Sequence, residues 1–75
     1  MTTYNGHPSW AYWNVSLWIA NDESLYRAAL ACIRRFRNKR DAAAAFIDTL
    51  EDTKTPDGAR YSTRAVIHAM QGLES

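Results

Sequence analysis

The chain has little cysteine and no long apolar run. Its 75 residues include one cysteine, Cys32, so no disulfide can form within the chain. Because small secreted domains usually rely on several disulfides, we expect a reducing, intracellular compartment. No stretch approaches the ~18 uninterrupted apolar residues of a transmembrane helix, so no membrane span is expected. The first eight residues, MTTYNGHP, do not combine a basic region with an apolar run, so we expect no signal peptide.

Residue sets that carry catalysis or bind metals are also missing from the sequence. His7 and His68 lie near opposite ends of the chain, and Cys32 has no second cysteine beside it. A protein metal site needs three or four ligands, and no such spacing occurs. The three glycines are isolated, so there is no Gly-rich phosphate loop. We therefore expect neither enzyme activity nor a bound metal or cofactor.

The composition that remains is that of a small globular protein. Apolar residues make up 47% of the chain and charged residues 23%. A chain this short forms one domain and buries only about 60% of the surface that its unfolded form exposes. Such a domain has no room for both a core and a large catalytic cleft. We expect a single domain over residues 1–75, in which residues 1–8 form an extended lead-in because Pro8 restricts the residue before it.

The spacing of apolar residues predicts four short helices and no strand. Apolar side chains recur every three or four residues over residues 23–37, 41–52 and 63–73, which is typical of amphipathic helices. Residues 10–20 are apolar on nearly all sides of a helix. Residues 53–59 contain Pro-Asp-Gly, a turn signal, and are expected to form a loop. The predicted fold class is therefore all-α, a compact bundle of about four short helices with an aromatic-rich first helix.

Polar residues between these segments predict where the helices begin and end. We expect Ser9, Asp22 and Ser62 to be N-caps, because their side chains accept hydrogen bonds from free backbone N–H groups. Asn21 is expected to end the first helix in a left-handed conformation, and Asn38 to end the second.

The aromatic residues of the first helix have two interpretations. Large rings are a means for a short chain to gain burial, so we expect this helix at the centre of the bundle with most of its rings in the core. One or two rings, such as Trp10 or Tyr12, are expected to stay exposed as anchors for a partner. Asn14 needs a hydrogen-bonding partner if it is buried, and we expect that partner near Asn21 and Asp22.

Charge is divided unevenly along a chain whose net charge is only +1. Six cations and no acid lie between Arg27 and Arg40, whereas residues 41–57 hold five acids and one cation. The basic segment could contact nucleic-acid phosphates, or it could dock against an acidic protein surface. It could also be a solvated helix end whose charges pair with the acidic third helix.

Residues 12–26, YWNVSLWIANDESLY, resemble a group of small uncharacterised proteins carried by bacteriophages and mobile elements. The signature of that group is approximately TWNVxLWIxNDExLY, and Tyr12 departs from it at the Thr position. Thr55-Pro56-Asp57-Gly58 is also similar to a loop in the group. The resemblance implies a phage or prophage accessory protein. Such proteins often bind and disable a host machine, such as a CRISPR–Cas effector, a restriction enzyme or a polymerase.

Together these features predict a phage-type protein that binds and inhibits a host protein or nucleoprotein complex stoichiometrically in the host cytoplasm. Its most concrete form is an anti-CRISPR or other anti-defence inhibitor. The alternative is a small nucleic-acid-binding regulator that uses residues 34–40, and a homo-oligomer with the first helix between subunits also stays open. The expected partner-binding residues are Arg34, Arg35, Arg37, Lys39, Arg40, Trp10 and Tyr12.

Overall fold

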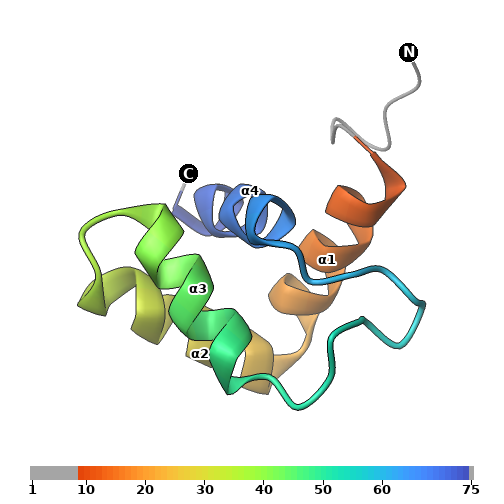
Figure 1. Cartoon of the computed structure of the whole chain (residues 1–75), viewed down its shortest axis with the longest axis horizontal. Helices are drawn as coiled ribbons and strands as arrows, with labels where there is room; N and C mark the ends of the chain where they lie inside the picture. Colours follow the sequence, from red (N-terminus) through yellow and green to blue (C-terminus); the bar gives the residue numbers. More distant parts are fainter. Residues whose placement is uncertain (1–8, 75) are drawn as a thin grey trace.

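Four helices pack around one core in the computed structural model, which describes residues 9–74 (Figure 1). The helices are α1 (Trp10–Asn21), α2 (Glu23–Arg35), α3 (Lys39–Thr49) and α4 (Thr63–Glu74). The predicted all-α bundle is confirmed, and within the described residues the only β pairing is one isolated bridge between Lys54 and Arg60. None of the helices in this part of the chain is long and apolar enough to cross a membrane. The extended lead-in predicted for residues 1–8 lies outside the described residues.

Each helix begins after a polar side chain that accepts a hydrogen bond from the backbone N–H three residues on. The predicted N-caps Ser9, Asp22 and Ser62 are confirmed. Two other predictions are wrong. Asn21 is still helical, and the chain turns at Asp22, whose backbone is extended rather than left-handed. Asn38 begins α3 instead of ending α2.

The bounds of α2 and α3 differ from the predicted ones for a physical reason. Phe36 has an extended backbone and packs its half-buried ring against the core, so α2 ends at Arg35. The side chain of Asn38 then caps a helix that starts at Lys39, two residues earlier than predicted. The turn between α2 and α3 is therefore short and fixed at both ends.

α2 and α4 each contact all three other helices, whereas α1 contacts α2 and α4 but not α3. The prediction that the aromatic helix α1 takes the centre is therefore wrong. The largest fully buried side chains are Phe46, Ile19, Met70, Val15, Val66 and Asn14. Buried alanines on α2, α3 and α4 allow the helices to approach closely.

The aromatic rings of α1 are less buried than predicted. Trp10 is 38% exposed, and Trp13 and Trp18 are half-buried. Phe46 and Tyr61, which lie outside α1, are the buried aromatic residues of the described chain. Figure 1 shows the reason, because α1 lies at the side of the bundle and only part of its surface faces other helices.

Candidate functional site

Four exposed arginines lie where α2 ends and α3 begins, at the left of Figure 1. We call these residues the basic corner: Arg34, Arg35, Arg37 and Arg40. Within residues 9–74, no acidic side chain forms an ion pair with any of them. The nearest acid in sequence, Asp41, accepts a hydrogen bond from the side chain of Asn38 at 3.0 Å. The basic corner is therefore a concentration of positive charge that no ion pair within the described residues neutralises.

Two other cations of the basic segment are engaged in ion pairs. Lys39 pairs with Glu74 and so joins the start of α3 to the end of α4. Arg27 pairs with Glu23 one turn earlier on α2, with 2.6 Å between the guanidinium and carboxylate atoms. Lys39 was predicted to bind a partner together with the arginines, but the structure gives it this partner within the chain.

A shallow groove of about 320 Å³ runs between α2 and α3 beside the basic corner. Its lining includes Cys32, Phe36 and Arg35, whose guanidinium lies 5.7 Å from the centre of the Phe36 ring. Burial raises the pKa of the Cys32 thiol, and the positive charge of Arg35 partly offsets this effect. The thiol is therefore protonated at neutral pH and is a weak nucleophile.

The predicted aromatic contacts lie away from the basic corner. Trp10 begins α1, at the opposite end of the molecule from the turn between α2 and α3 (Figure 1). Tyr12 is half-buried, and its ring centre lies 5.3 Å from that of His68 on α4. The structure brings the four arginines together, but it does not bring Trp10 or Tyr12 to them.

A second polar cluster joins α1 to the loop between α3 and α4. The Asn14 amide, buried on α1, donates a hydrogen bond to Asp57 Oδ2 at 2.9 Å. The same oxygen accepts a hydrogen bond from the indole Nε1 of Trp18 at 2.9 Å. Asn14 Oδ1 accepts from the Thr55 hydroxyl at 2.6 Å. The prediction that Asn14 pairs near Asn21 and Asp22 is therefore wrong. We call the four hydrogen-bonded residues the loop clasp: Asn14, Trp18, Thr55 and Asp57.

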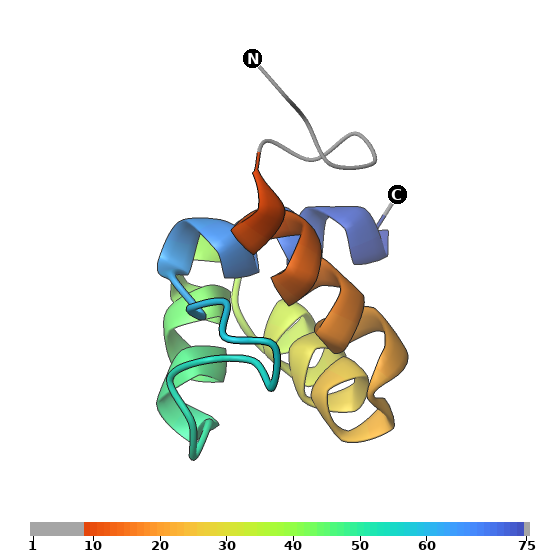
Figure 2. The ribbon, with the colours of Figure 1, turned by 90° about the vertical axis from the view of Figure 1, so that its right-hand side faces the viewer.

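The loop clasp also shapes the loop itself, which crosses in front of the core between α1 and α3 in Figure 2. Thr55 Oγ1 accepts a hydrogen bond from the Ala59 N–H at 3.0 Å, and the Thr55 N–H donates to the Ala59 carbonyl at 2.7 Å. Gly58 has a φ of +96°, a backbone conformation that residues other than glycine rarely adopt. Hydrogen bonds from Asn14 and Trp18 lower the pKa of Asp57. The loop is thus held in one shape and fixed to α1.

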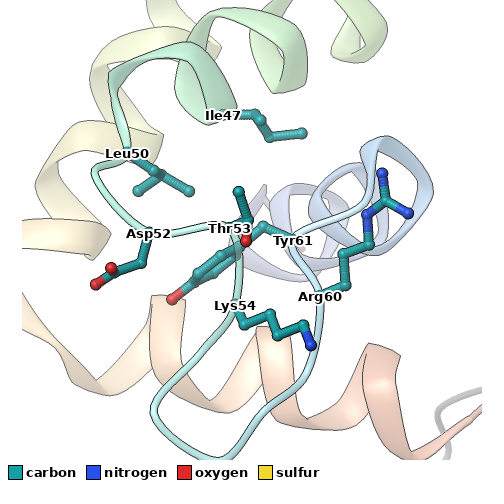
Figure 3. Close-up of a pocket in the computed structure, with 7 residues that line it drawn as sticks. All are labelled: Ile47, Leu50, Asp52, Thr53, Lys54, Arg60 and Tyr61. Carbon is teal, nitrogen blue, oxygen red and sulfur yellow. The ribbon is translucent and has the colours of Figure 1, made fainter.

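The loop and the end of α3 enclose a cavity of about 380 Å³ (Figure 3). Ile47, Leu50 and Tyr61 give it apolar walls, and Lys54 and Arg60 stand on its loop side. The pKa of Tyr61 is raised by burial and, to a smaller extent, by Asp22 and Asp52. Sequence reasoning missed this cavity. Its one signal was that Lys54 and Arg60 flank the Pro-Asp-Gly turn.

Within residues 9–74, no three side chains of the metal-binding types His, Cys, Asp and Glu gather in one place. Among the described residues, the basic corner and the cavity beside the loop both combine exposed cations with a surface that a ligand or partner can reach.

Comparison with known proteins gives a family and no activity. Residues 1–73 match the model of a family of unknown function, DUF7249. Neither the search of curated proteins nor the search of solved structures gave a match.

Proposed function

We propose that this chain, which belongs to the DUF7249 family of unknown function, is a stoichiometric binding protein. Its basic corner docks against an acidic surface of a larger protein complex. The observation that carries the proposal is the presence of four exposed arginines within seven residues, with no ion pair among the described residues. Arginine is enriched at the energetic centres of protein interfaces and can bind a carboxylate through two hydrogen bonds.

The local backbone favours docking by this segment. The Phe36 N–H donates to the Cys32 carbonyl at 3.1 Å, and the Asp41 N–H donates to the Asn38 side chain at 2.8 Å. The arginines therefore extend from a turn that is already ordered before a partner binds. Less conformational entropy is lost on association when the backbone is already in its bound shape.

The resemblance of residues 12–26 gives the proposal its most concrete form. In this form the protein is a phage or mobile-element product that inhibits a host defence complex, such as a CRISPR–Cas effector, by occupying a site on it in the host cell. This form is supported by the resemblance, and the arginines of the basic corner supply the contact surface.

The test is affinity capture from a bacterial lysate with three tagged proteins in parallel. They are the wild type, the basic-corner variant Arg34→Glu/Arg37→Glu, and a control with the same change of charge, Arg27→Glu/Arg64→Glu. We expect the wild type and the control to retain the same defined complex and the basic-corner variant to lose it, with unchanged helical circular dichroism. Equal capture by the basic-corner variant would reject this placement of the interface.

Nucleic acid is the second candidate partner, because unpaired arginines also suit phosphate oxygens. If four arginines each neutralise one phosphate, the logarithm of the DNA affinity falls with the logarithm of salt concentration with a slope of about −3.6. A mobility-shift titration with duplex DNA at low salt measures this slope. A flat titration removes the nucleic-acid candidate and leaves the protein-docking proposal in place.

A further inference from the structure

Two cations stand on opposite strands of the loop between α3 and α4, and their charged ends point in different directions in Figure 3. Lys54 and Arg60 form the isolated antiparallel bridge, and residues directly opposite in such a pair have Cβ atoms about 4.5–5.5 Å apart on one face. Like charges in this position destabilise the pair. Within residues 9–74 neither cation has an ion-pair partner. Both side chains are exposed and long enough to turn toward one anion, which would be paired with two otherwise unpaired cations.

The cavity of about 380 Å³ lies beside these cations and is mainly apolar. In Figure 3 the side chains of Ile47 and Leu50 come from the side of α3, and Lys54 and Arg60 come from the loop. The carboxylate of Asp52 points to the opposite side of the view from the Lys54 ammonium. The cavity thus combines an apolar part with a positive part, and its one acid is turned away from the cations.

The loop that carries Lys54 and Arg60 is fixed in place without a ligand. The Tyr61 N–H donates to the Thr53 carbonyl at 3.0 Å, next to the bridge. Asp57, at the tip of the loop, is held by Asn14 and Trp18 of α1. Because the loop clasp orders this wall, a ligand would not have to order the loop backbone as it binds, and only the Lys54 and Arg60 side chains would turn toward it.

The size and the lining together define the ligand class. A volume of about 380 Å³ is at the small end of ligand pockets, which are typically about 300–1,000 Å³. Two cations suit a single carboxylate, since charge-assisted hydrogen bonds are the strong ones. A ligand with several phosphates would place charge against Ile47 and Leu50, where it would lose solvation without compensation.

We propose that this cavity binds an apolar carboxylate, with the carboxylate between Lys54 and Arg60 and a short branched alkyl group against Ile47, Leu50 and Tyr61. A free organic acid and the C-terminal residue of a polypeptide share this chemistry. The site lies at the far end of α3 from the basic corner (Figure 1), so it is independent of the docking surface described above.

The first experiment is a titration of the ¹⁵N-labelled full chain followed by ¹H–¹⁵N correlation spectra. The probes are 4-methylpentanoate, which is a free acid, N-acetyl-leucine, which imitates a chain terminus, and N-acetyl-leucinamide, which lacks the charge. We expect both acids to shift the amide signals of Leu50, Thr53, Lys54, Arg60 and Tyr61 at millimolar concentrations, and the amide to bind at least about tenfold more weakly. Tighter binding of N-acetyl-leucine would assign the site to a polypeptide terminus. Equal or tighter binding of 4-methylpentanoate would assign it to a free acid.

The proposal is overturned if neither acid shifts these signals up to about 20 mM, or if the amide binds as well as the acids. It is also overturned if the shifts occur at the basic corner instead.

The second experiment separates the cations from the general charge of the protein. The variant Lys54→Gln/Arg60→Gln should bind the acids at least about tenfold more weakly than the wild type. The control Arg27→Gln/Arg64→Gln loses the same charge elsewhere and should bind like the wild type. Both variants change exposed residues, and circular dichroism confirms that they fold. Unchanged binding by the Lys54→Gln/Arg60→Gln variant would also overturn the proposal.

Discussion

Replacement of Thr55 by valine tests the loop clasp, because valine keeps the shape of threonine and removes its hydroxyl. Thr55 is 4% exposed, and its hydroxyl both donates to Asn14 Oδ1 at 2.6 Å and accepts from the Ala59 N–H at 3.0 Å. Thr55→Val therefore leaves Asn14 Oδ1 and the Ala59 N–H without this hydrogen-bond partner. A buried polar group left unsatisfied costs about 1–3 kcal/mol, so we expect a loss of at least about 2 kcal/mol in the free energy of unfolding.

That loss is large for a chain of this size. Domains have about 0.05–0.15 kcal/mol of stability per residue, or about 4–11 kcal/mol for this protein. With a shift of about 4–8 °C per kcal/mol, Thr55→Val should lower the Tm by at least about 8 °C. The control Thr55→Ser keeps the hydroxyl and loses one methyl group, so it should cost only about 1 kcal/mol.

The assay is urea unfolding followed by circular dichroism and tryptophan fluorescence. If Thr55→Val is no less stable than Thr55→Ser, the hydrogen bonds of the loop clasp do not stabilise the fold and our reasoning fails. The double variant Thr55→Val/Asn14→Leu gives a further check. Because it replaces both partners of one hydrogen bond by apolar groups, it should cost less than the sum of the two single changes.

Three further predictions concern single charged or reactive groups. Because the pKa of Asp57 is lowered in the folded state, its contribution to stability is complete above about pH 4 and is lost as the pH falls through the folded-state pKa. In an acid titration, Asp57→Asn should therefore lose less stability below about pH 4 than the wild type. Lys54→Glu turns a like-charged bridge into an oppositely charged one, so it should stabilise the free protein by about 0.2–1 kcal/mol in urea unfolding and abolish binding of the apolar carboxylates. The raised pKa of Cys32 predicts that iodoacetamide alkylates its thiol slowly at pH 7 and faster as the pH rises. Arg35→Ala should slow the alkylation further, because it removes a positive charge that favours the thiolate. An alkylation rate at pH 7 equal to that of a free peptide thiol would contradict this prediction.

The features that were predictable from the sequence are local ones. Ser9, Asp22 and Ser62 each cap a helix through a hydrogen bond to a residue three positions on, so their role can be read from the nearby sequence. The approximate positions of the helices follow from the spacing of apolar residues for the same reason. Asn38 shows the limit, since either end of a helix suits asparagine and the packing of Phe36 decides which helix it belongs to.

The features that were not predictable depend on contacts between distant parts of the chain. Asn14 finds its partners on a loop about 40 residues further on, where no local pattern points to it. Lys39 is joined to Glu74 by the packing of α3 against α4. The cavity beside Lys54 and Arg60 is formed where residues at the end of α3 and residues of the following loop come together, as Ile47 and Tyr61 do. A helix that is apolar on all sides, such as α1, likewise does not reveal which side the other helices cover.

The resemblance also gains a physical interpretation. Asn14, Trp18 and Asp22 lie within residues 12–26, on which the expected phage origin rests, and Thr55 and Asp57 lie within residues 55–58. In the structure these residues form the loop clasp and a helix cap. We therefore expect the signature to report the fold, whereas the basic corner, which lies outside it, determines the partner.

The most direct test of the central claim is a measurement of affinity for the purified captured complex. Three proteins are compared: the wild type, the basic-corner variant Arg34→Glu/Arg37→Glu and the control Arg27→Glu/Arg64→Glu. Truncation of a residue at the centre of an interface costs about 2 kcal/mol or more, so reversal of two such charges should weaken binding at least about a hundredfold. The control should bind within about threefold of the wild type, since exposed charges outside an interface contribute little. If the basic-corner variant binds as tightly as the control, the arginines do not form the docking surface and the proposed function is contradicted.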